Sequence, residues 1–570
     1  MKHKRNYLLF LGFVALLFAA CKKDKMDMKV DNRLVPQNRT NSNVRIINLS
    51  SFNQVIANGD SLTNFVVQNP RGPDYYKYPA TSYFPGDGRL GKTWNVPQDL
   101  FDKNEKINFH IATRVYLGSG VNEDITFQAV NSYQNPTDYY LLPTFFMTGQ
   151  PEVVPVPRDV TAPKKADHFK IRIVNLSGQL KSLANGPTGA QENLSGPVSL
   201  AFADGTLVDA KTSNITTAAK FSEYVEVPYG TYQFKVLMAD GRQVPSQSKS
   251  FPESAIIDPP TSTMPVDYKG ITNLTFAPIQ TYQPGGVYTI VITPQKFEYI
   301  SNELGETVTM YQNSFQVLSD ISAAANQTYY RVQGANAFNN QPIGFRVNGN
   351  EIAKSIDFGK ASGYSTFVHG QAKIEAIDAS GKVLAEANQL LRPAQNYTLW
   401  LHPEANGNPK LLVLSNDLSG TQSLPVEEDG TYGRTEINFF NFDRYLNLSV
   451  GNPYITFTAD NGQALSTAKI NLQPGIPIFE QPYIRANLML PSYQIMAYRS
   501  TPTVVPGIWA KDIEVLSSEQ FIANKELYLK AGRKLPTQEA GVFTVALIGK
   551  TGSNVNANEK ARIVIIKHNK

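Results

Sequence analysis

The sequence predicts an all-β protein made of tandem β-sandwich modules. Its 570 residues are enough for several domains, and 28 Tyr, 30 Phe, 39 Gly and 36 Pro against a charged fraction of 18% favour short strands and turns over solvated helices. The chain also repeats itself, which indicates copies of one module. Val44-Arg45-Ile46-Ile47-Asn48-Leu49-Ser50 returns as Ile171-Arg172-Ile173-Val174-Asn175-Leu176-Ser177, with weaker echoes at Tyr330-Arg331-Val332-Gln333-Gly334 and Glu436-Ile437-Asn438-Phe439-Phe440-Asn441.

The amino terminus has the pattern of a bacterial lipoprotein leader. A basic start is followed by an apolar run from Tyr7 to Phe18, and Ala19-Ala20 stand directly before Cys21, the only cysteine of the chain. We therefore expect residues 1–20 to be a lipoprotein signal peptide and Cys21 to carry a lipid. An ordinary secretory leader that happens to contain a cysteine is the alternative, since Phe18 stands where Leu is commonest.

Charge and cysteine content narrow the class of protein. Loss of residues 1–20 removes three cations, Lys2, Lys4 and Arg5, and no acid, so the formal charge falls from +5 to +2 and nucleic acid is not an expected partner. With Cys21 acylated, the folded part has no thiol for a disulfide, a metal site or a nucleophile. No later apolar run is long enough to cross a bilayer, so the lipid is the expected attachment to the membrane.

Breaks in composition divide the chain. Residues 21–42 are polar and almost free of aromatic side chains, which predicts a flexible lipid-anchored stalk. Further breaks are proline-rich, small and polar, or acidic, and they fall at 155–167, 319–327 and 420–433. The predicted β-sandwich modules are residues 43–160 with an aromatic loop insertion, 168–320, 327–419 and 434–570.

Local patterns predict the elements inside each module. Alternation such as Tyr232, Phe234, Val236 indicates half-buried strands, and the glycines of Ala239-Asp240-Gly241 and Ala379-Ser380-Gly381 suit hairpin turns. One helix is expected after the capping-box sequence Ser517-Ser518-Glu519-Gln520, with Gly532 as its stop.

Each module also closes on a strand that an aromatic residue opens. The four residues are Tyr139, Tyr288, Tyr397 and Phe543. A tyrosine in this place resembles the corner of an immunoglobulin-like sandwich, where the ring packs inward and the hydroxyl bonds to nearby backbone. Phe543 has no hydroxyl, so its corner is expected to be held by packing alone.

A family resemblance rests on the third and second modules. The third carries Gly344-Phe345-Arg346-Val347-Asn348-Gly349, Ile356-Asp357-Phe358-Gly359, Tyr397-Thr398-Leu399-Trp400 and Leu411-Leu412-Val413-Leu414-Ser415-Asn416-Asp417-Leu418, and the second carries Ser222-Glu223-Tyr224-Val225-Glu226-Val227-Pro228-Tyr229-Gly230-Thr231-Tyr232. These segments resemble an uncharacterised immunoglobulin-like repeat family of bacterial (Bacteroidota-type) envelope lipoproteins, of the domain-of-unknown-function 4397 type. The resemblance implies a fold and a location in the envelope, and it brings no known active residues.

The candidate ligand-binding residues lie in the insertion of the first module. Six rings stand among Pro and Gly without strand alternation: Tyr75, Tyr76, Tyr78, Tyr83, Phe84 and Trp94. Exposed rings on a stiff loop can stack on sugars or grip a protein partner. The alternative is that the insertion folds back and buries its own rings.

Other patterns point to no cofactor, metal or nucleotide. Gly86-Asp87-Gly88-Arg89-Leu90-Gly91-Lys92-Thr93 spells a phosphate-binding loop, but neither a buried strand before it nor a helix after it is expected. His110 should be solvated on its strand, and Glu427-Glu428-Asp429-Gly430 is more simply a linker turn than a calcium site. No Gly-x-Ser-x-Gly elbow occurs.

These observations favour a non-catalytic lipoprotein of the outer membrane or cell surface that acts in adhesion or in capture of an extracellular ligand such as a glycan. One alternative is a structural or assembly component of an envelope complex or fibre, in which edge strands pair with a protein partner. A hydrolase is the third, because two carboxylates can meet in space without leaving a sequence pattern.

Overall fold

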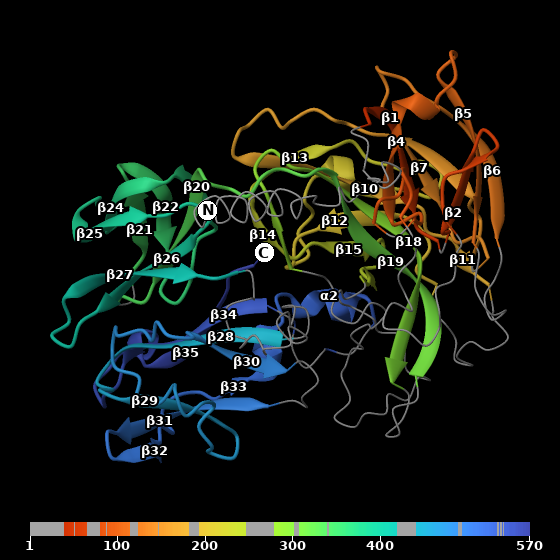
Figure 1. Ribbon diagram of the computed structural model, residues 1–570. Helices are drawn as coiled ribbons and strands as arrows, with labels where there is room; N and C mark the ends of the chain where they lie inside the picture. The colour runs from red at the N-terminus through yellow and green to blue at the C-terminus, as the bar shows by residue number, and fades with distance from the viewer. Residues whose placement is uncertain are drawn as a thin grey trace, which may run out of the picture. The chain divides into compact units, whose positions relative to one another are not determined.

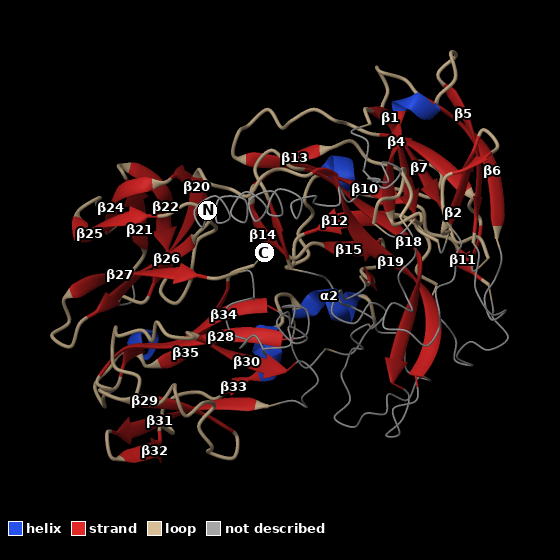
Figure 2. Ribbon diagram, viewed as in Figure 1, coloured by secondary structure: helices blue, strands red, loops and turns tan. Residues whose placement is uncertain are grey.

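The computed structural model confirms an all-β chain (Figure 2). It describes residues 39–50, 52–64, 80–86, 88–113, 123–145, 147–181, 193–246, 279–300, 307–338, 341–418, 440–487, 493–532, 535, 539 and 541–569. The predicted leader with Cys21, the stalk as far as residue 38, Tyr75, Tyr76, Tyr78 and the acidic turn at 427–430 lie outside these residues. The chain divides into two compact units, 1–141 and 142–570.

The unit 1–141 holds one module, module 1, with two sheets. In one sheet β1 pairs antiparallel with β4 and parallel with β7. The other has the order β3-β2-β5-β6, and its apolar side chains alternate with polar ones along β5, where Ile107, Phe109 and Ile111 are buried. The elements are β1 (Asn41–Asn48), β2 (Gln54–Ala57), β3 (Asp60–Ser61), β4 (Thr93–Pro97), η1 (Gln98–Leu100), β5 (Lys106–Ala112), β6 (Asp124–Val130) and β7 (Thr137–Leu141).

The unit 142–570 begins with short strands and continues with module 2, the strands β10 to β19. Its main sheet has the order β13-β10-β18-β19, and β12-β15-β16 and β14-β17 form smaller sheets (Figure 1). The elements are β8 (Met147–Thr148), β9 (Val153–Pro157), β10 (His168–Asn175), β11 (Gln179–Leu180), β12 (Val198–Ala201), η2 (Ala210–Thr212), β13 (Val225–Pro228), β14 (Gly230–Tyr232), β15 (Lys235–Met238), β16 (Gln243–Val244), β17 (Gln280–Tyr282), β18 (Val287–Ile300) and β19 (Thr307–Ile321).

Module 3, the strands β20 to β27, has two four-stranded sheets with the orders β23-β20-β26-β27 and β22-β21-β24-β25. Its core lies between them and includes Tyr330, Phe345, Ile374 and Leu399. The strands are β20 (Tyr329–Asn336), β21 (Ile343–Val347), β22 (Asn350–Ile356), β23 (Ser365–Val368), β24 (Gly370–Ile377), β25 (Val383–Leu391), β26 (Asn396–Pro403) and β27 (Pro409–Asn416).

Module 4, from β28 to β35, has the sheets β30-β28-β34-β35 and β29-β31-β32, with β33 paired to β31. The buried side chains of Leu446, Ala546 and Ile548 face away from the core of module 4. They share one apolar cluster with Ala335 and Trp400 of module 3. The elements are β28 (Phe440–Val450), β29 (Ile455–Ala459), β30 (Tyr483–Asn487), β31 (Gln494–Thr501), β32 (Val504–Trp509), β33 (Leu516–Ser517), η5 (Ser518–Phe521), α2 (Lys525–Lys530), β34 (Gly541–Lys550), η6 (Ala557–Glu559) and β35 (Arg562–Lys567).

All four modules share one strand arrangement. The first strand of each lies parallel to a late strand, in the pairs β1 with β7, β10 with β18, β20 with β26 and β28 with β34. A parallel pair needs a long connection, and the rest of the module supplies it. In module 3 the eight strands divide as fourth-first-seventh-eighth and third-second-fifth-sixth. This order differs from the ABED and CFG sheets of an immunoglobulin constant domain.

A buried asparagine at or near the end of the first strand marks the repeat. Asn48, Asn175, Asn336 and Asn447 each donate their side-chain amide to two backbone carbonyls further along the chain, and these bonds are buried or partly buried. This asparagine corrects the register of the two weak echoes. With the asparagines superposed, residues 45–48 of the first repeat align with residues 333–336 of the third and 444–447 of the fourth. The sequence had placed these two echoes at 330–334 and 436–441.

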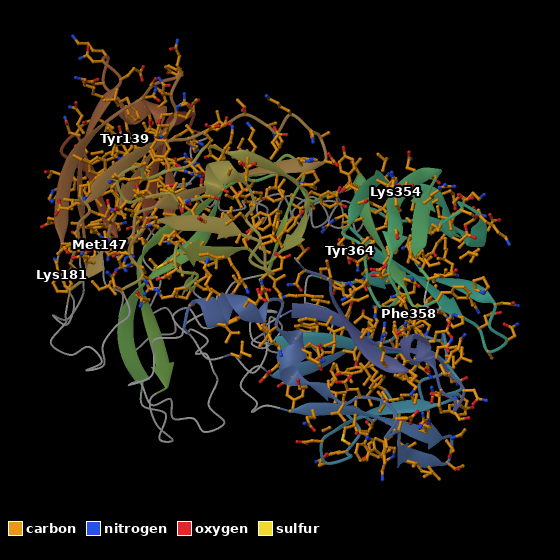
Figure 3. All side chains as sticks on the ribbon, turned by 180° about the vertical axis from the view of Figure 1, so that it is seen from behind. Tyr139, Met147, Lys181, Lys354, Phe358 and Tyr364 are labelled. Atoms are coloured by element: carbon orange, nitrogen blue, oxygen red, sulfur yellow. The ribbon has the colours of Figure 1, made fainter. Side chains whose placement is uncertain are left out.

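The tyrosine corners are confirmed. The hydroxyl oxygen of Tyr139 accepts a hydrogen bond from the backbone N–H of Val130, and those of Tyr288 and Tyr397 accept one from the residue five positions upstream, each at 3.1 Å. The side chain of Tyr139 is labelled in Figure 3. Phe543 is buried without such a bond, as its chemistry requires.

The predicted helix is present in two pieces. The capping box of Ser517 and Gln520 begins the 3-10 helix η5, which ends at Phe521. A second start follows at Asn524, whose side chain accepts from the N–H of Glu526 and begins α2. Gly532, with φ of +68°, follows the end of α2.

Candidate functional site

A hollow lies on the sheet β3-β2-β5-β6 of module 1 (strands β2, β5 and β6 in Figure 1). The strand register aligns Ile56, His110 and Thr126 in one row across β2, β5 and β6. Because side chains alternate between the two faces of a strand, the burial of Ile107, Phe109 and Ile111 in the core leaves Asn108 and His110 on the opposite face. The row therefore brings one apolar and two polar side chains from three strands to one surface.

The hollow has a volume of about 460 Å³ and combines an apolar part with polar groups. It is lined by Ile56, Gly59, Asn108, Phe109, His110, Thr126 and Phe127. Gly59 has φ of +94°, and no atom lies within 4 Å of the position that a Cβ would take there. The backbone at this edge of the hollow is thus open to an approaching ligand.

Hydrogen bonds fix the polar side chains of this surface. The side-chain amide of Gln128 donates to Oδ1 of Asn108 at 3.0 Å, so the Nδ2 group of Asn108 is oriented by its neighbour on β6. Nε2 of His110 lies 3.3 Å from Oδ1 of Asp124, which holds the imidazole beside the hollow. A ligand in the hollow would meet an amide, a hydroxyl and an imidazole around apolar side chains, as small-molecule sites usually do.

The aromatic residues predicted to bind a ligand take another role where the structure describes them. The side chains of Phe84 and Trp94 are 6% and 8% exposed, and their ring centroids lie 5.0 Å apart. Both rings are therefore inaccessible to a ligand, as the alternative of self-packing expects. Tyr83 is half-buried, and the guanidinium of Arg39 lies 4.1 Å from its ring centroid. Trp94 packs edge-on against Phe109, a residue that also lines the hollow.

The segment that spells a phosphate-binding loop forms no such loop. Its described residues from Gly86 to Lys92 are turns, bends and irregular backbone, and Thr93 begins the strand β4. A phosphate-binding loop requires a helix at this point, because the helix N-terminus supplies the N–H groups. Among the residues that the structure describes, no group of three or more His, Cys, Asp or Glu side chains could hold a metal ion.

Sequence reasoning missed the exposed tryptophan of the chain. Trp94 and Trp400 are buried, whereas Trp509 on β32 is 37% exposed and has the ammonium of Lys511 5.7 Å from its ring centroid. β32 lies at the end of the sheet β29-β31-β32, and Val504 and Ile508 are also exposed along it. The signal in the sequence is a short apolar run, Val504-Val505-Pro506-Gly507-Ile508-Trp509, that Pro and Gly interrupt.

Comparisons with known proteins identify one segment. Residues 331–427 match the family described as "Domain of unknown function (DUF4397)", which confirms the resemblance seen in the third module. No curated protein matches the chain. No helix in the described part of the chain is long and apolar enough to cross a membrane.

Solved structures show only remote similarity. A candidate cell adhesion protein from Bacteroides fragilis is 10% identical with a TM-score of 0.13, and the match covers 44% of this chain and 98% of that one. The TIE protein of Bacillus anthracis is 10% identical with a TM-score of 0.11, covering 88% and 69%. A Ca²⁺-stabilized adhesin with which an Antarctic bacterium binds ice is 9% identical with a TM-score of 0.08, covering 84% and 98%. At such scores none of them carries an argument about this chain.

Proposed function

We propose that the protein is a non-catalytic lipoprotein of the outer membrane or cell surface that captures an extracellular glycan in the hollow of module 1. The observation that supports this most is the combination of the apolar side chain of Ile56 with Asn108, His110 and Thr126 on the outer face of the sheet, in one open hollow. A sugar ring has an apolar C–H face and a rim of hydroxyls, so it needs both kinds of group together. The volume of about 460 Å³ suits a ligand of a few sugar rings at most.

The lining also supports binding without hydrolysis. Glycoside hydrolysis usually requires two carboxyl groups on opposite sides of the bond that breaks. The residues that line the hollow include no carboxyl group, and the nearby Asp124 is hydrogen-bonded to His110. An anchor at Cys21 and the stalk of residues 21–42 would hold such a capture module away from the membrane.

Removal of the polar side chains of the hollow tests this proposal. The double variant Asn108→Ala, Thr126→Ala should lose binding to the polysaccharides that the full chain retains on a glycan array, and its melting temperature should stay within a few degrees of the wild type. Lys103→Ala, in an exposed turn of the same module, is the matched control and should bind like the wild type. Absence of any glycan bound by the wild type, or unchanged binding by the double variant, would refute the proposal.

A role in an envelope assembly is the second candidate, and the surface of β32 favours it. Ile508 is 79% exposed on a strand at the edge of a sheet, where a protein partner could cover it. Ile508→Lys should then reduce the native size of the detergent-extracted protein, measured by sedimentation. An unchanged size would exclude assembly through this strand.

A further inference from the structure

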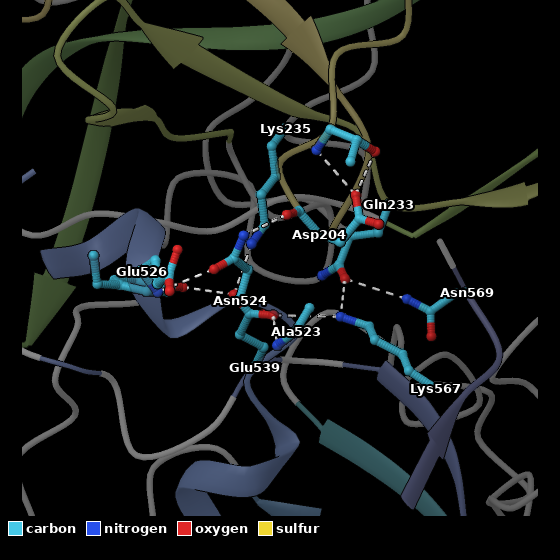
Figure 4. A network of polar contacts seen from close by, with 11 residues as sticks. Asp204, Gln233, Lys235, Ala523, Asn524, Glu526, Glu539, Lys567 and Asn569 are labelled. Carbon is cyan, nitrogen blue, oxygen red and sulfur yellow. Dashed lines mark hydrogen bonds and ion pairs between the residues drawn. The ribbon is translucent and has the colours of Figure 1, made fainter. Parts of the chain in front are cut away.

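Modules 2 and 4 meet at a buried carboxylate that lies between two ammonium groups (Figure 4). Oε1 of Glu539 is 2.6 Å from Nζ of Lys235 on β15, and Oε2 is 3.5 Å from Nζ of Lys567 at the end of β35. The side chains of Lys235, Glu539 and Lys567 are 3%, 7% and 14% exposed. The carboxylate also accepts from the hydroxyl of Tyr528 and the N–H of Ala523, so its position is fixed from several sides.

A side-chain amide completes this group. Gln233, in the connection between β14 and β15, accepts at Oε1 a hydrogen bond of 2.8 Å from Nζ of Lys567 and one of 3.2 Å from Nδ2 of Asn569. Since a C=O bond is about 1.23 Å long, Cδ of Gln233 lies within about 4 Å of Nζ of Lys567. An amine, an amide carbonyl, a carboxylate and an N–H donor to the carbonyl oxygen are thus held together in a site that is largely shielded from water.

The charges of the site favour a nucleophilic amine. Burial lowers the pKa of Lys567 to about 8, although the attraction of Glu539 opposes this shift. At neutral pH roughly one tenth of the amine is therefore uncharged, far more than for an exposed lysine. Burial raises the pKa of Glu539, but the ammonium groups of Lys235 and Lys567 outweigh it and hold this pKa at about 2. Glu539 is therefore ionised. The attraction of Lys567 lowers this pKa only while its amine is charged, so the pKa of Glu539 rises when the amine is neutral and the carboxylate can then take up a proton.

We propose that Lys567 and Gln233 react with each other to form an intramolecular amide bond between modules 2 and 4. The uncharged Nζ of Lys567 attacks Cδ of Gln233. The new C–N bond leaves Nζ positively charged, and Glu539 accepts a proton from it. The Nδ2 group of Asn569 donates to the oxygen on which negative charge develops. The bond from Cδ to Nε2 of Gln233 then breaks, and Nε2 leaves as ammonia with the proton from Glu539. One amine and one primary amide give one secondary amide and one ammonia, so no oxidant or other reactant is needed.

This bond would connect residues 334 positions apart. Module 4 could then not separate from module 2 without breaking a covalent bond, whether by thermal fluctuation or by a force applied through a bound ligand. The inference does not depend on what module 1 binds. The close distances and the shielding from water make the reaction effectively unimolecular, the condition under which a slow aminolysis becomes feasible.

Peptide mapping of the purified full chain tests the proposal directly. Trypsin should yield the peptide 221–235 joined to the peptide 563–570, lighter than their sum by one ammonia, with fragment ions that place the bond between Gln233 and Lys567. Cleavage after Lys567 should be absent, because its side chain is acylated. Recovery of the two peptides unjoined from the wild type would overturn the proposal.

Two variants separate this reaction from other losses of ammonia. Lys567→Arg keeps a cation beside Glu539 and Gln233 but cannot form this amide, so it should give unjoined peptides. Cyclisation of an asparagine also releases ammonia. If the peptide mass of Lys567→Arg is still lower by one ammonia, the loss has such a source, and this would count against the cross-link. Glu539→Gln removes the proton acceptor and should reduce the joined fraction of the folded, gel-filtered protein at least tenfold, within the range typical of general base catalysis. An undiminished joined fraction in that variant would refute the role of Glu539.

Discussion

The corner of module 3 gives a prediction whose magnitude follows from its geometry. Tyr397 is buried, and its hydroxyl oxygen lies 3.1 Å from the backbone nitrogen of Arg392, which donates to it. Tyr397→Phe keeps the ring and removes the acceptor. A net hydrogen bond contributes about 1 kcal/mol, and an N–H left buried without a partner costs about 1–3 kcal/mol. Because this bond is only partly buried, we expect a loss at the lower end of this range, about 1 kcal/mol.

Amide hydrogen exchange at Arg392 measures this loss where it occurs. A cost of about 1 kcal/mol corresponds to exchange roughly five times faster at this amide. The matched control is Tyr133→Phe, since Tyr133 is 68% exposed and its replacement should leave exchange at Arg392 unchanged. Equal exchange rates at Arg392 in Tyr397→Phe and the wild type would refute the corner as a stabilising bond. That result would not argue against burial of the ring, because Phe543 is buried at the equivalent position of module 4 without a hydroxyl.

Four further outcomes are expected. Trp94→Ala should lower the stability of module 1 by about 3–5 kcal/mol in a denaturant titration, because it opens a cavity beside buried rings; a loss below about 1 kcal/mol would show that the ring is not in the core. Glu539→Gln should destabilise by about 3–5 kcal/mol, because it leaves the buried ammonium group of Lys235 without its carboxylate, and combination with Lys235→Met should recover part of this loss, as a double-mutant cycle can establish. Burial and Arg444 lower the pKa of His568 to about 3, so the unfolded chain binds more protons than the folded one between pH 6.5 and 3. The free energy of unfolding should therefore fall as the pH falls through this window. If it falls no more steeply in the wild type than in His568→Gln, the assignment is contradicted. Cys21→Ala should move the chain from the detergent extract to the soluble fraction, and continued need of detergent would end the lipoprotein proposal.

Local patterns were sufficient for much of the fold. Alternating apolar residues, the tyrosines that open late strands and the capping box of Ser517 act over a few residues, so their outcome does not depend on distant parts of the chain. The repeat was visible for the same reason in its two strongest copies. The predicted register was wrong in the weaker copies because it was based on similar residue types. The shared feature is the buried asparagine, Asn336 or Asn447, whose hydrogen-bond partners lie 20 and 25 residues further along the chain.

The sequence by itself determined the all-β class, the corners and the leader pattern that predicts an anchor at Cys21. Only the tertiary structure decided which rings are exposed: Trp94 is enclosed by Phe84 and Phe109, while Trp509 meets solvent on an edge strand. It also decided the candidate sites. The hollow needs β2, β5 and β6 in one register, and the Lys567 site joins residues 334 positions apart. Burial and proximity of this kind arise from long-range packing, and no local pattern of residues encodes them.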